Sequence, residues 1–433
     1  MGFEKLFEPI KIGPTEIKNR LAVAPMNLAG DRSGHPTRQY SCYFNARALG
    51  GFGLLTTGSI LTNKESHEEC GGMTPGLYVG SKNYGYYSDF TDSVHSQGTG
   101  AKIFAQLSIG FGRQTGMPGA KGASAIPLDP KVINRNLNKG QTACSEYWFA
   151  DWGAHYIHPP REMTIEEIKA DERTYVESAA MAIAAGFDGI EVHAPHGYLV
   201  HQFLSARSNQ RKDEYGGSLK NRARLLLNLV GGLKGLFGDA VPIMVRLSGR
   251  EYHEGGNSAE DVRQICRWCV DAGADAISLS NGSGYDDMKH FMPVDNNPEL
   301  MAAQGKKLRD ACGVPVIHVG LNDPAVACKA VEDGETDMIT LGRASLCDPE
   351  WPNKVKEGRI KEIVKCIKCE FCNGISIQAG RCNLRCSKNP RLGVEENFPE
   401  YWPKAMKATV PEALKRWKPG KMWKSTLGYE LGK

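Results

Sequence analysis

Short apolar runs recur along the chain, and amphipathic stretches separate them. The runs are rich in Val, Ile and Leu without alternation, which is typical of strands buried on both faces. They lie at Leu21–Pro25, Gly53–Ser59, Lys102–Leu107, Gly189–Ala194, Pro242–Ser248, Asp275–Ser280, Pro315–Gly320 and Asp337–Gly342. Eight such runs alternating with helical patterns predict an α/β fold, a parallel (β/α)8 TIM barrel. A doubly wound open sheet is the alternative, and the count favours closure.

Helix signals lie between the runs. Thr164 and Glu167 have capping-box spacing at the start of the pattern Thr164–Gly186. Asp323-Pro324 supplies a cap followed by proline at the first helical position. The pair Cys266-x2-Cys269 lies inside a helical pattern without a partner pair, so we expect buried packing there and no metal site.

The pattern divides the chain into three parts. Residues 1–360 form the expected barrel, 361–390 a cysteine-rich segment, and 391–433 an extended tail. Within the barrel, residues 110–160 form one long connection after the third strand, and loops of this length are usually functional. Barrel chemistry belongs at the carboxyl ends of the strands, so candidate residues are sought there and in the cysteine-rich segment.

Composition excludes several classes of function. The 433 residues are 41% hydrophobic and 24% charged, as in ordinary soluble enzymes, and a net charge of +4 is too small to indicate a nucleic-acid partner. The sequence shows no signal peptide and no apolar run long enough for a membrane span, so we expect a cytoplasmic protein. Residues 404–433 hold eight Lys or Arg and two acids, which predicts a solvated tail or one that docks an acidic partner.

Thirteen cysteines are spread unevenly, and five of them crowd into one short segment. That segment reads Cys366-x2-Cys369-x2-Cys372-x9-Cys382-x3-Cys386. A disulfide framework would not look like this in so long a chain, and thiolates at this spacing bind an iron–sulfur cluster or zinc. The spacing favours the cluster, with zinc as the alternative.

The fourth strand ends in three protic side chains, His193, His196 and Tyr198. Two imidazoles can donate hydrogen bonds to one carbonyl or carboxylate oxygen and so polarise an adjacent C=C bond, and a nearby phenol can deliver a proton. Buried structural histidines and a zinc pair are the alternatives.

Polar residues also follow other strands. Gln106 ends the third strand and can read a ring edge, and Arg246 ends the fifth, where it either stabilises an anionic cofactor ring or forms a structural ion pair. Glycines and an arginine after the last two strands predict a phosphate cradle. They are Gly320, Asn322, Gly342 and Arg343.

Several motifs in order resemble the Old Yellow Enzyme family, and most closely its iron–sulfur branch, which contains 2,4-dienoyl-CoA reductase. They are Leu6-Phe7-Glu8-Pro9, Lys18-Asn19-Arg20, Ala24-Pro25-Met26, Pro160-Arg161-Glu162-Met163-Thr164, the His193–Tyr198 block, Gln202-Phe203-Leu204-Ser205 and Asp213-Glu214-Tyr215-Gly216-Gly217-Ser218-Leu219. The matches run from residue 3 to about residue 390.

The resemblance implies FMN in the barrel mouth. Its isoalloxazine would contact Pro25, Met26, Asn27, Gly58, Gln106 and Arg246, and its phosphate end would contact Gly320, Asn322, Gly342 and Arg343. His193 and His196 would bind the electron-withdrawing group of the substrate, and Tyr198 would be the proton donor. Asn27 stands where the family usually has Thr or Cys, and the stretch Gln106–Arg113 lacks the family's histidine.

The resemblance also implies a 4Fe-4S cluster on Cys366, Cys369, Cys372 and a fourth cysteine. Cys386 is favoured over Cys382 because Cys386 precedes Ser387-Lys388-Asn389-Pro390, as the family's last ligand does. The branch usually continues into FAD- and NAD(P)H-binding domains, and this sequence ends soon after the cluster motif. We therefore expect FAD and NAD(P)H on a partner or not used directly, with a flavoprotein or a ferredoxin as electron donor.

The expected function is an anaerobic ene-reductase. FMN N5 would give hydride to an activated alkene (an enone, enoate or enoyl thioester), Tyr198 would give the proton, and the cluster would supply electrons. An amine dehydrogenase or demethylase that passes electrons outward is the alternative, and a zinc-ribbon module on a non-redox barrel is a third. Association of the chain with copies of itself stays open.

Overall fold

The computed structural model describes residues 2–28, 34–70, 74–115, 117–129, 158–284, 298–369, 372 and 385–397. Most of the long connection after the third barrel strand, Cys382 and nearly all of the tail 391–433 lie outside the described residues. The predictions that fall on those segments therefore stay predictions.

Eight parallel strands of the described chain close into a barrel, which confirms the predicted fold. They are β3 (Leu21–Val23), β4 (Leu54–Thr56), β6 (Lys102–Ser108), β9 (Gly189–His193), β10 (Ile243–Ser248), β11 (Ala276–Ser280), β12 (Val316–Val319) and β13 (Met338–Leu341). The sheet follows chain order, and pairing of β3 with β13 and of β4 with β6 completes the ring. A short strand, β5 (Ile60–Leu61), pairs with the far end of β6.

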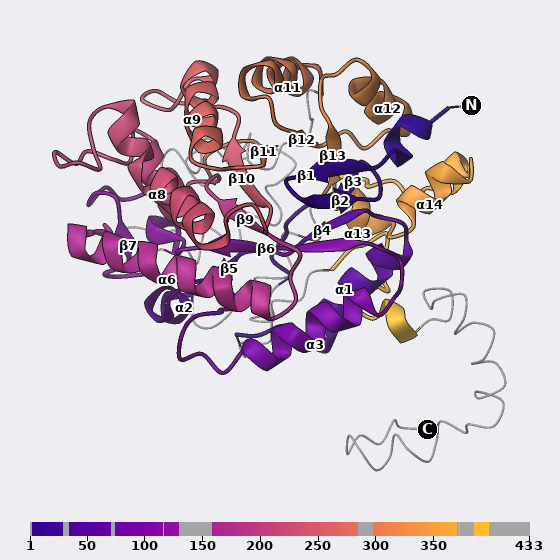
Figure 1. Cartoon of the computed structure of the whole chain (residues 1–433), viewed down its shortest axis with the longest axis horizontal. Coiled ribbons are helices and arrows are strands. Elements are labelled where there is room, and N and C mark those ends of the chain that lie inside the picture. The colour runs from indigo at the N-terminus through magenta and orange to yellow at the C-terminus, as the bar shows by residue number, and fades with distance from the viewer. Residues whose placement is uncertain are drawn as a thin grey trace, which may run out of the picture.

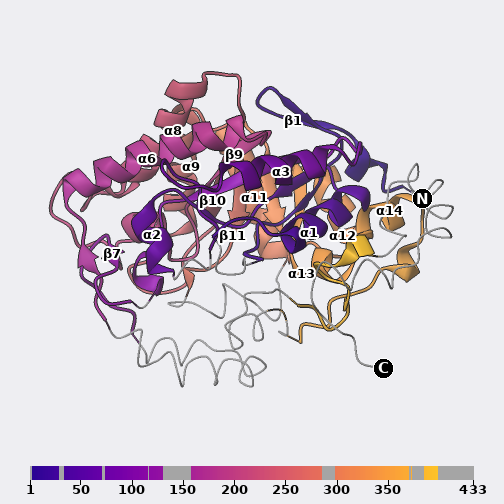
Figure 2. The same ribbon diagram turned by 90° about the horizontal axis from the view of Figure 1, so that it is seen from below.

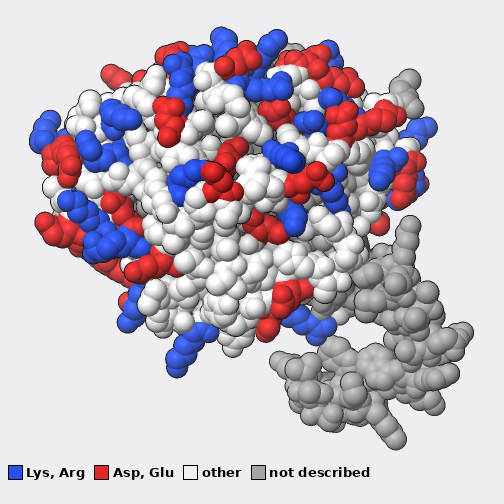
Figure 3. Space-filling view, viewed as in Figure 1, with Lys and Arg blue, Asp and Glu red and all other residues white. Residues whose placement is uncertain are grey.

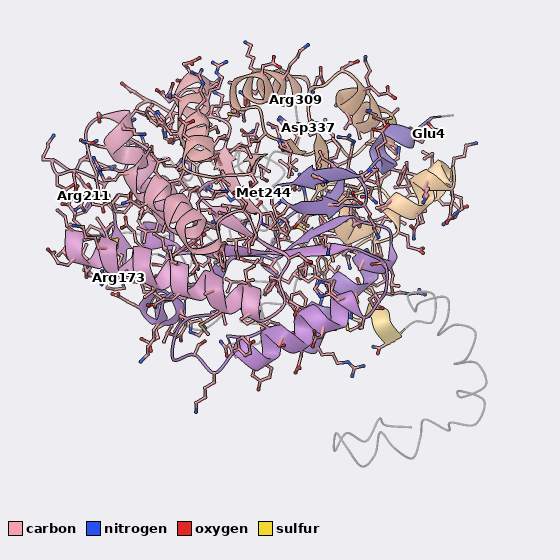
Figure 4. All side chains as sticks on the ribbon, in the orientation of Figure 1. Glu4, Arg173, Arg211, Met244, Arg309 and Asp337 are labelled. Carbon is pink, nitrogen blue, oxygen red and sulfur yellow. The ribbon has the colours of Figure 1, made fainter. Side chains whose placement is uncertain are left out.

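The lower end of the barrel is filled by side chains. Residues near the starts of the strands form an inward layer made of Ala22, Leu54, Phe104, Met244, Ala276, Ile317 and Met338. Met244 lies at the centre of the ring of strands in Figure 4. The antiparallel hairpin of β1 (Ile10–Ile12) and β2 (Thr15–Ile17) adds Ile12 and Ile17 to this layer and closes the amino end. The carboxyl ends of the strands are thereby left for chemistry.

Helices surround the barrel (Figure 1). The main ones are α1 (Arg38–Leu49), α3 (Tyr84–His95), α6 (Ile165–Ala184), α8 (Leu219–Phe237), α9 (Ala259–Asp271), α11 (Pro298–Cys312) and α12 (Pro324–Glu332). Shorter elements are η1 (Glu4–Phe7), α2 (Lys64–Glu69), η2 (Gly112–Thr115), α7 (Leu199–Leu204) and the two-strand pair β7 (Lys121–Gly122) with β8 (Arg161–Glu162).

The helix signals of the sequence are confirmed at their ends. The capping box of Thr164 and Glu167 is formed in both directions at the start of α6. The Asp323 carboxylate accepts hydrogen bonds from the backbone N–H groups of Ala325 and Val326, with Pro324 at the first position of α12. Cys266 and Cys269 are buried on α9, as expected for packing residues.

After the barrel the chain turns back along its side. The segment contains α13 (Arg343–Cys347), α14 (Trp351–Lys356), η4 (Ile360–Glu362) and η5 (Glu395–Asn397). Figure 2 shows η5 and α13 close to α1, and a buried ion pair between Arg47 of α1 and Glu395 joins them at 2.7 Å. The end of the described chain is therefore fixed to the first helix of the barrel.

Charges of both signs are interspersed over the face shown in Figure 3, with no large patch of one sign. Many are paired across elements. Arg309 of α11 and Asp337 before β13, both labelled in Figure 4, form an ion pair at 3.1 Å. Among the described residues, no helix has the length and apolarity that crossing a membrane requires.

Candidate active site

A polar layer lies above the apolar filling of the barrel. The Gln106 amide donates to the Glu191 carboxylate at 2.6 Å, and its oxygen accepts from the Ser59 hydroxyl at 3.2 Å. On the next strand, Arg246 Nη1 donates to the Ser278 hydroxyl at 2.9 Å. Burial raises the pKa of Glu191, and the nearby Arg246 opposes that rise. The layer thus holds a fixed cation in a site with little water.

Arg246 has more donors than this layer uses. Its Nε is buried and makes no hydrogen bond within the described part of the chain. A buried guanidinium N–H without a partner is costly and indicates that a ligand completes the site. An anionic or hydrogen-bond-accepting ring edge fits that donor, and FMN offers such an edge.

Three residues predicted to contact the flavin lie together at the ends of β3 and β4. A Cβ atom on Gly58 would overlap the Met26 carbonyl oxygen and the Asn27 side chain, so only glycine allows this approach. A Cβ atom on Gly342 would lie 4.0 Å from the Met26 sulfur, which places the end of β13 beside the same group. Pro25 follows β3 directly. The predicted flavin contacts of these strands are thus close to one another at the carboxyl ends of β3, β4 and β13.

The residues predicted for the phosphate end lie after two neighbouring strands. Gly320 has a φ of +99°, and its N–H donates to the Thr340 carbonyl of β13 at 3.4 Å. The Asn322 N–H donates back to the Gly320 carbonyl at 3.1 Å. Gly342 precedes α13 and Arg343 is its first residue. The structure therefore brings these four residues to one side of the barrel mouth, where Arg343 also lines a cavity formed by cysteines.

His193 and His196 face one another. His193 Nε2 lies 3.2 Å from His196 Nδ1, and His196 Nε2 lies 2.6 Å from the Ser280 hydroxyl. Burial lowers the pKa of both imidazoles well below the usual value, and Arg246 adds to the effect. Both rings are therefore neutral at physiological pH, with one N–H donor each. The sequence predicts that both imidazoles bind one external oxygen. In the structure they are hydrogen-bonded to each other, so a ligand oxygen would bind by inserting between the two rings.

The turn that carries these groups is tightly held. His196 and Gly197 both adopt left-handed backbone, with φ of +69° and +73°. The Gly197 N–H donates to His201 Nδ1 at 3.0 Å, and His201 Nε2 lies 3.2 Å from Glu251 Oε1. Because Nδ1 accepts, the ring proton sits on Nε2 and is donated to the carboxylate.

Glu251 is the buried carboxylate that holds this arrangement in place. Burial tends to raise its pKa, but His201 and the hydrogen bonds from the Asn257 N–H and the Ser205 hydroxyl outweigh burial and lower the pKa to about 2. The Glu251 carboxylate therefore stays ionised and holds His201, which in turn holds the strained turn of the site.

Tyr198 follows the turn and is the last residue before α7. Its ring centroid lies 5.1 Å from that of His193 and 4.5 Å from that of Phe111. Burial raises the pKa of the Tyr198 phenol to about 12, with Cys70 adding to the rise. The phenol therefore keeps its proton at neutral pH beside the imidazole pair, as a general acid must.

The cysteine segment forms a second site. Cys366, Cys369, Cys372 and Cys386 line one cavity together with Arg343, and Cys347 of α13 joins them. Cys369 Sγ lies 3.0 Å from the Ser387 hydroxyl, and Cys347 Sγ lies 3.5 Å from Cys386 Sγ. The hydrogen bond with Cys347 lowers the pKa of Cys386 to about 6.

This cavity fits a thiolate-ligated group by the chemistry of its donors. The side chains are not drawn together as in a closed metal site, since no group of three or more metal-binding side chains is formed among the described residues. Cys382 lies outside those residues, so the choice between it and Cys386 is not tested.

The roles of some residues in these sites cannot be predicted from the sequence. Glu191 is one such residue, because it lies within a buried strand, paired in register with Met244 and two positions from Arg246 on the next strand. His201 and Glu251 become partners only through the fold. Cys347 stands nineteen residues before Cys366 and so was counted with the scattered cysteines.

Comparisons with known proteins agree with this geometry. The family model described as NADH:flavin oxidoreductase / NADH oxidase family matches residues 5–362. An NADH oxidase of Thermoanaerobacter brockii is 34% identical over 406 residues, which are 92% of this chain and 58% of that protein. A cinnamate reductase of Clostridium sporogenes is 33% identical over 422 residues, 92% of this chain and 59% of that protein. The chain thus spans about three fifths of the length of these two relatives.

Two solved structures share the architecture. A 2-naphthoyl-CoA reductase in complex with 2-naphthoyl-CoA superposes with a TM-score of 0.77 at 27% identity, over 92% of this chain and 59% of that one. A histamine dehydrogenase from Rhizobium sp. 4-9 superposes with a TM-score of 0.72 at 26% identity, over 91% of this chain and 53% of that one.

Proposed function

The chain belongs to the NADH:flavin oxidoreductase / NADH oxidase family of flavin-dependent enzymes, and from that premise we propose that it reduces the activated C=C bond of a small molecule. One observation carries the proposal. A half-buried, protonated phenol, Tyr198, lies beside two neutral imidazoles at the carboxyl end of the barrel. This set can polarise an electron-withdrawing group and protonate the carbon next to it.

FMN fits the mouth of the barrel. Arg246 with its unused Nε and the amide of Gln106 would hold the polar edge of the isoalloxazine, and the backbone at Pro25, Met26, Asn27 and Gly58 would lie along the ring. Gly320, Asn322, Gly342 and Arg343 would hold the phosphate end. Bound FMN supplies the hydride.

The histidines bind and polarise the substrate. A carbonyl or carboxylate oxygen that enters between His193 and His196 can accept the N–H of each ring after their mutual hydrogen bond opens. Neutral imidazoles suit this role because they remain donors without demanding a counterion. The two hydrogen bonds withdraw electron density from the C=C bond and make its β-carbon electrophilic, as hydride transfer requires.

Tyr198 donates the proton. Its phenol keeps the proton because desolvation raises the pKa of the phenol, and the Phe111 ring packs against its ring. The proton passes from Tyr198 Oη to the α-carbon, and the phenolate that results is reprotonated from solvent when product leaves. Enones, enoates and enoyl thioesters all fit this chemistry. The relatives that act on cinnamate and bind 2-naphthoyl-CoA support an aryl-substituted acid or thioester as the first candidates.

The cysteine cavity is proposed to hold a 4Fe-4S cluster on Cys366, Cys369, Cys372 and Cys386. The four thiols line one cavity that adjoins Arg343, at the phosphate end of the proposed flavin site, so the cluster would stand beside the flavin. One edge is open to solvent, since Cys369 is exposed and Ile367 is 60% exposed. Electrons would enter at that edge.

The open edge has a basic rim. Lys365, Lys368, Arg385 and Lys388 are exposed around the cluster motif. A cationic rim attracts an acidic electron carrier and speeds its association. We therefore favour a flavoprotein or ferredoxin as electron donor, with FAD and NAD(P)H on a partner or not used directly.

An amine dehydrogenase is the second candidate, because histamine dehydrogenase shares the architecture. It would run electrons outward through the same cluster. The His193, His196 and Tyr198 set favours the reductive direction, because these groups stabilise negative charge and supply a proton, whereas a cationic amine needs neither.

The test is a single-turnover experiment without oxygen. Protein loaded with FMN is reduced with dithionite and mixed with cinnamate or a cyclic enone, the oxidised protein is mixed with histamine, and flavin absorbance is followed in each case. We expect reoxidation by an alkene, with Tyr198→Phe slower by about 10²–10⁴-fold at unchanged flavin content. Equal rates for Tyr198→Phe and the unaltered protein would overturn the role of Tyr198. Reduction of the oxidised flavin by histamine would instead favour the amine dehydrogenase.

A further inference from the structure

The cavity of the cysteine segment holds one thiol more than a four-iron cluster uses. Five cysteines of the described residues line it, namely Cys347, Cys366, Cys369, Cys372 and Cys386. A [4Fe–4S] cluster takes four thiolates. Cys347 is the odd member, because it belongs to α13 at the end of the barrel and not to the cysteine motif.

Cys347 is fixed in place by the fold. Its residue is 4% exposed, and its Sγ lies 3.5 Å from Cys386 Sγ. The Asn389 amide donates to the Leu346 carbonyl at 2.8 Å, which holds the segment of Cys386 against α13 next to Cys347.

The other side of the cavity is held as firmly. Asp348, directly after Cys347, accepts the Val364 N–H at 2.8 Å and the Lys354 ammonium at 2.7 Å. This fixes the chain two residues before Cys366. Hydrogen bonds at and directly after α13 therefore hold the neighbourhood of Cys347 and the two motif cysteines.

We propose that Cys347 is a non-ligating thiol of the cluster pocket, whose S–H donates a hydrogen bond to the cluster-bound sulfur of Cys386 and raises the reduction potential of the cluster. The inference rests on the proposed 4Fe-4S cluster. Four thiolates complete the ligand set, and a fifth negative charge in the same cavity would be repelled by them. Cys347 therefore takes part as a neutral donor.

The sign of the effect follows from charge. The reduced cluster carries one more negative charge than the oxidised cluster, and part of that charge lies on the cysteine sulfurs. A hydrogen-bond donor stabilises the more negative state more strongly, so it favours reduction. The donor comes from α13, which also carries Arg343 of the proposed phosphate site, so the barrel itself sets how readily the cluster accepts electrons.

The test is a redox titration of the full chain, reconstituted with iron and sulfide without oxygen. Electron paramagnetic resonance reports the reduced cluster in the unaltered protein, Cys347→Ala and Cys347→Ser, and iron is assayed in each. At a fixed potential near the midpoint we expect the ratio of reduced to oxidised cluster in Cys347→Ala to fall about tenfold, about 59 mV for one electron. Cys347→Ser keeps an O–H donor and should recover most of the difference. Cys328→Ala, a cysteine of α12 outside the cavity, is the matched control and should titrate as the unaltered protein does.

Two outcomes would overturn the inference. If Cys347→Ala binds less iron or gives a three-iron signal, Cys347 is a ligand and not a donor. If it keeps four irons with an unchanged midpoint, the hydrogen bond does not tune the cluster. Failure of the unaltered protein to bind four irons is a different result, because it contradicts the proposed cluster itself.

Discussion

Arg47 of α1 and Glu395 of η5 form an ion pair that water does not reach. Arg47 Nη1 lies 2.7 Å from Glu395 Oε1, and both side chains are 0% exposed. The other guanidinium donors bind the Ser345 carbonyl at 2.8 and 3.1 Å and the Tyr43 carbonyl at 2.9 Å. One side chain thus joins α1, α13 and the chain that follows the cysteine motif.

Removing one member of this pair should be severe. Arg47→Met leaves the Glu395 carboxylate buried without a counterion, which costs about 3–5 kcal/mol of unfolding free energy. The double variant Arg47→Met/Glu395→Leu buries no charge and should be markedly more stable than Arg47→Met alone. Urea unfolding followed by circular dichroism measures both.

A matched control uses an exposed pair. Lys329 of α12 and Asp333, directly after that helix, lie 2.6 Å apart with side chains 74% and 45% exposed. Lys329→Met should change the unfolding free energy far less than Arg47→Met does, because water screens an exposed ion pair. A similar loss in Lys329→Met and Arg47→Met would contradict the argument from burial.

A second prediction concerns Glu251, which acts through His201 on the turn of His196 and Gly197. Glu251→Gln removes the charge that fixes the His201 tautomer. The turn should then lose its precise placement, and alkene-dependent flavin reoxidation should slow by about tenfold to a hundredfold. Stopped-flow spectroscopy measures the rate, and the solvent isotope effect should grow because proton transfer from Tyr198 becomes more limiting.

The control is Glu260→Gln, which alters an exposed carboxylate in the first turn of α9. It should leave both the rate and the isotope effect unchanged. If Glu251→Gln slows the reaction only by lowering flavin content, Glu251 has a structural role and does not position the acid.

The fold and the site were predictable to different depths. The eight strands could be predicted because each is a continuous apolar run, whose burial does not depend on which strands lie beside it. The capping box of Thr164 and Glu167 could be predicted because it is a local signal. His193, His196 and Tyr198 follow one strand end and so stay together in any barrel. Contacts that depend on strand register or long-range packing could not be predicted from the sequence. Gln106 and Glu191, which are paired on the adjacent strands β6 and β9, are an example. Cys347 belongs to the same class, since only the return of the chain past α13 brings it to Cys386.

A third prediction concerns acid stability and His318 on β12. Its side chain is fully buried, and neither ring nitrogen has a hydrogen-bond partner in the described chain. Burial lowers the pKa of His318 from 6.5 to about 4. A depressed folded-state pKa means that the neutral ring contributes stability above pH 6.5, and that this contribution is lost as the pH falls toward 4.

His318→Leu should therefore be more stable than the unaltered protein in acid. At pH 5 the relief amounts to about 2 kcal/mol, and at pH 8 the titration no longer contributes. Thermal unfolding at the two pH values measures the difference, and the informative quantity is the change between them. Equal effects of His318→Leu at pH 5 and pH 8 would show that the ring is not buried neutral.

The last prediction concerns the pH at which proton donation fails. Tyr198 has a pKa raised by burial from 10.0 to about 12, and Phe111 covers its ring at 4.5 Å. The acid is active below its pKa, so single-turnover reoxidation by an alkene should show no fall up to about pH 10.5, where a solvent-exposed tyrosine would already be mostly ionised. Phe111→Ala admits water to the phenol, weakens the burial effect and should move the alkaline limb down toward pH 10. A rapid pH jump in the stopped-flow instrument limits exposure to alkali.

Phe237→Ala, on α8 and away from the site, is the control and should leave the limb in place. A limb that stays put in Phe111→Ala would mean that the barrel around Tyr198, and not its aromatic neighbour, keeps water from the acid.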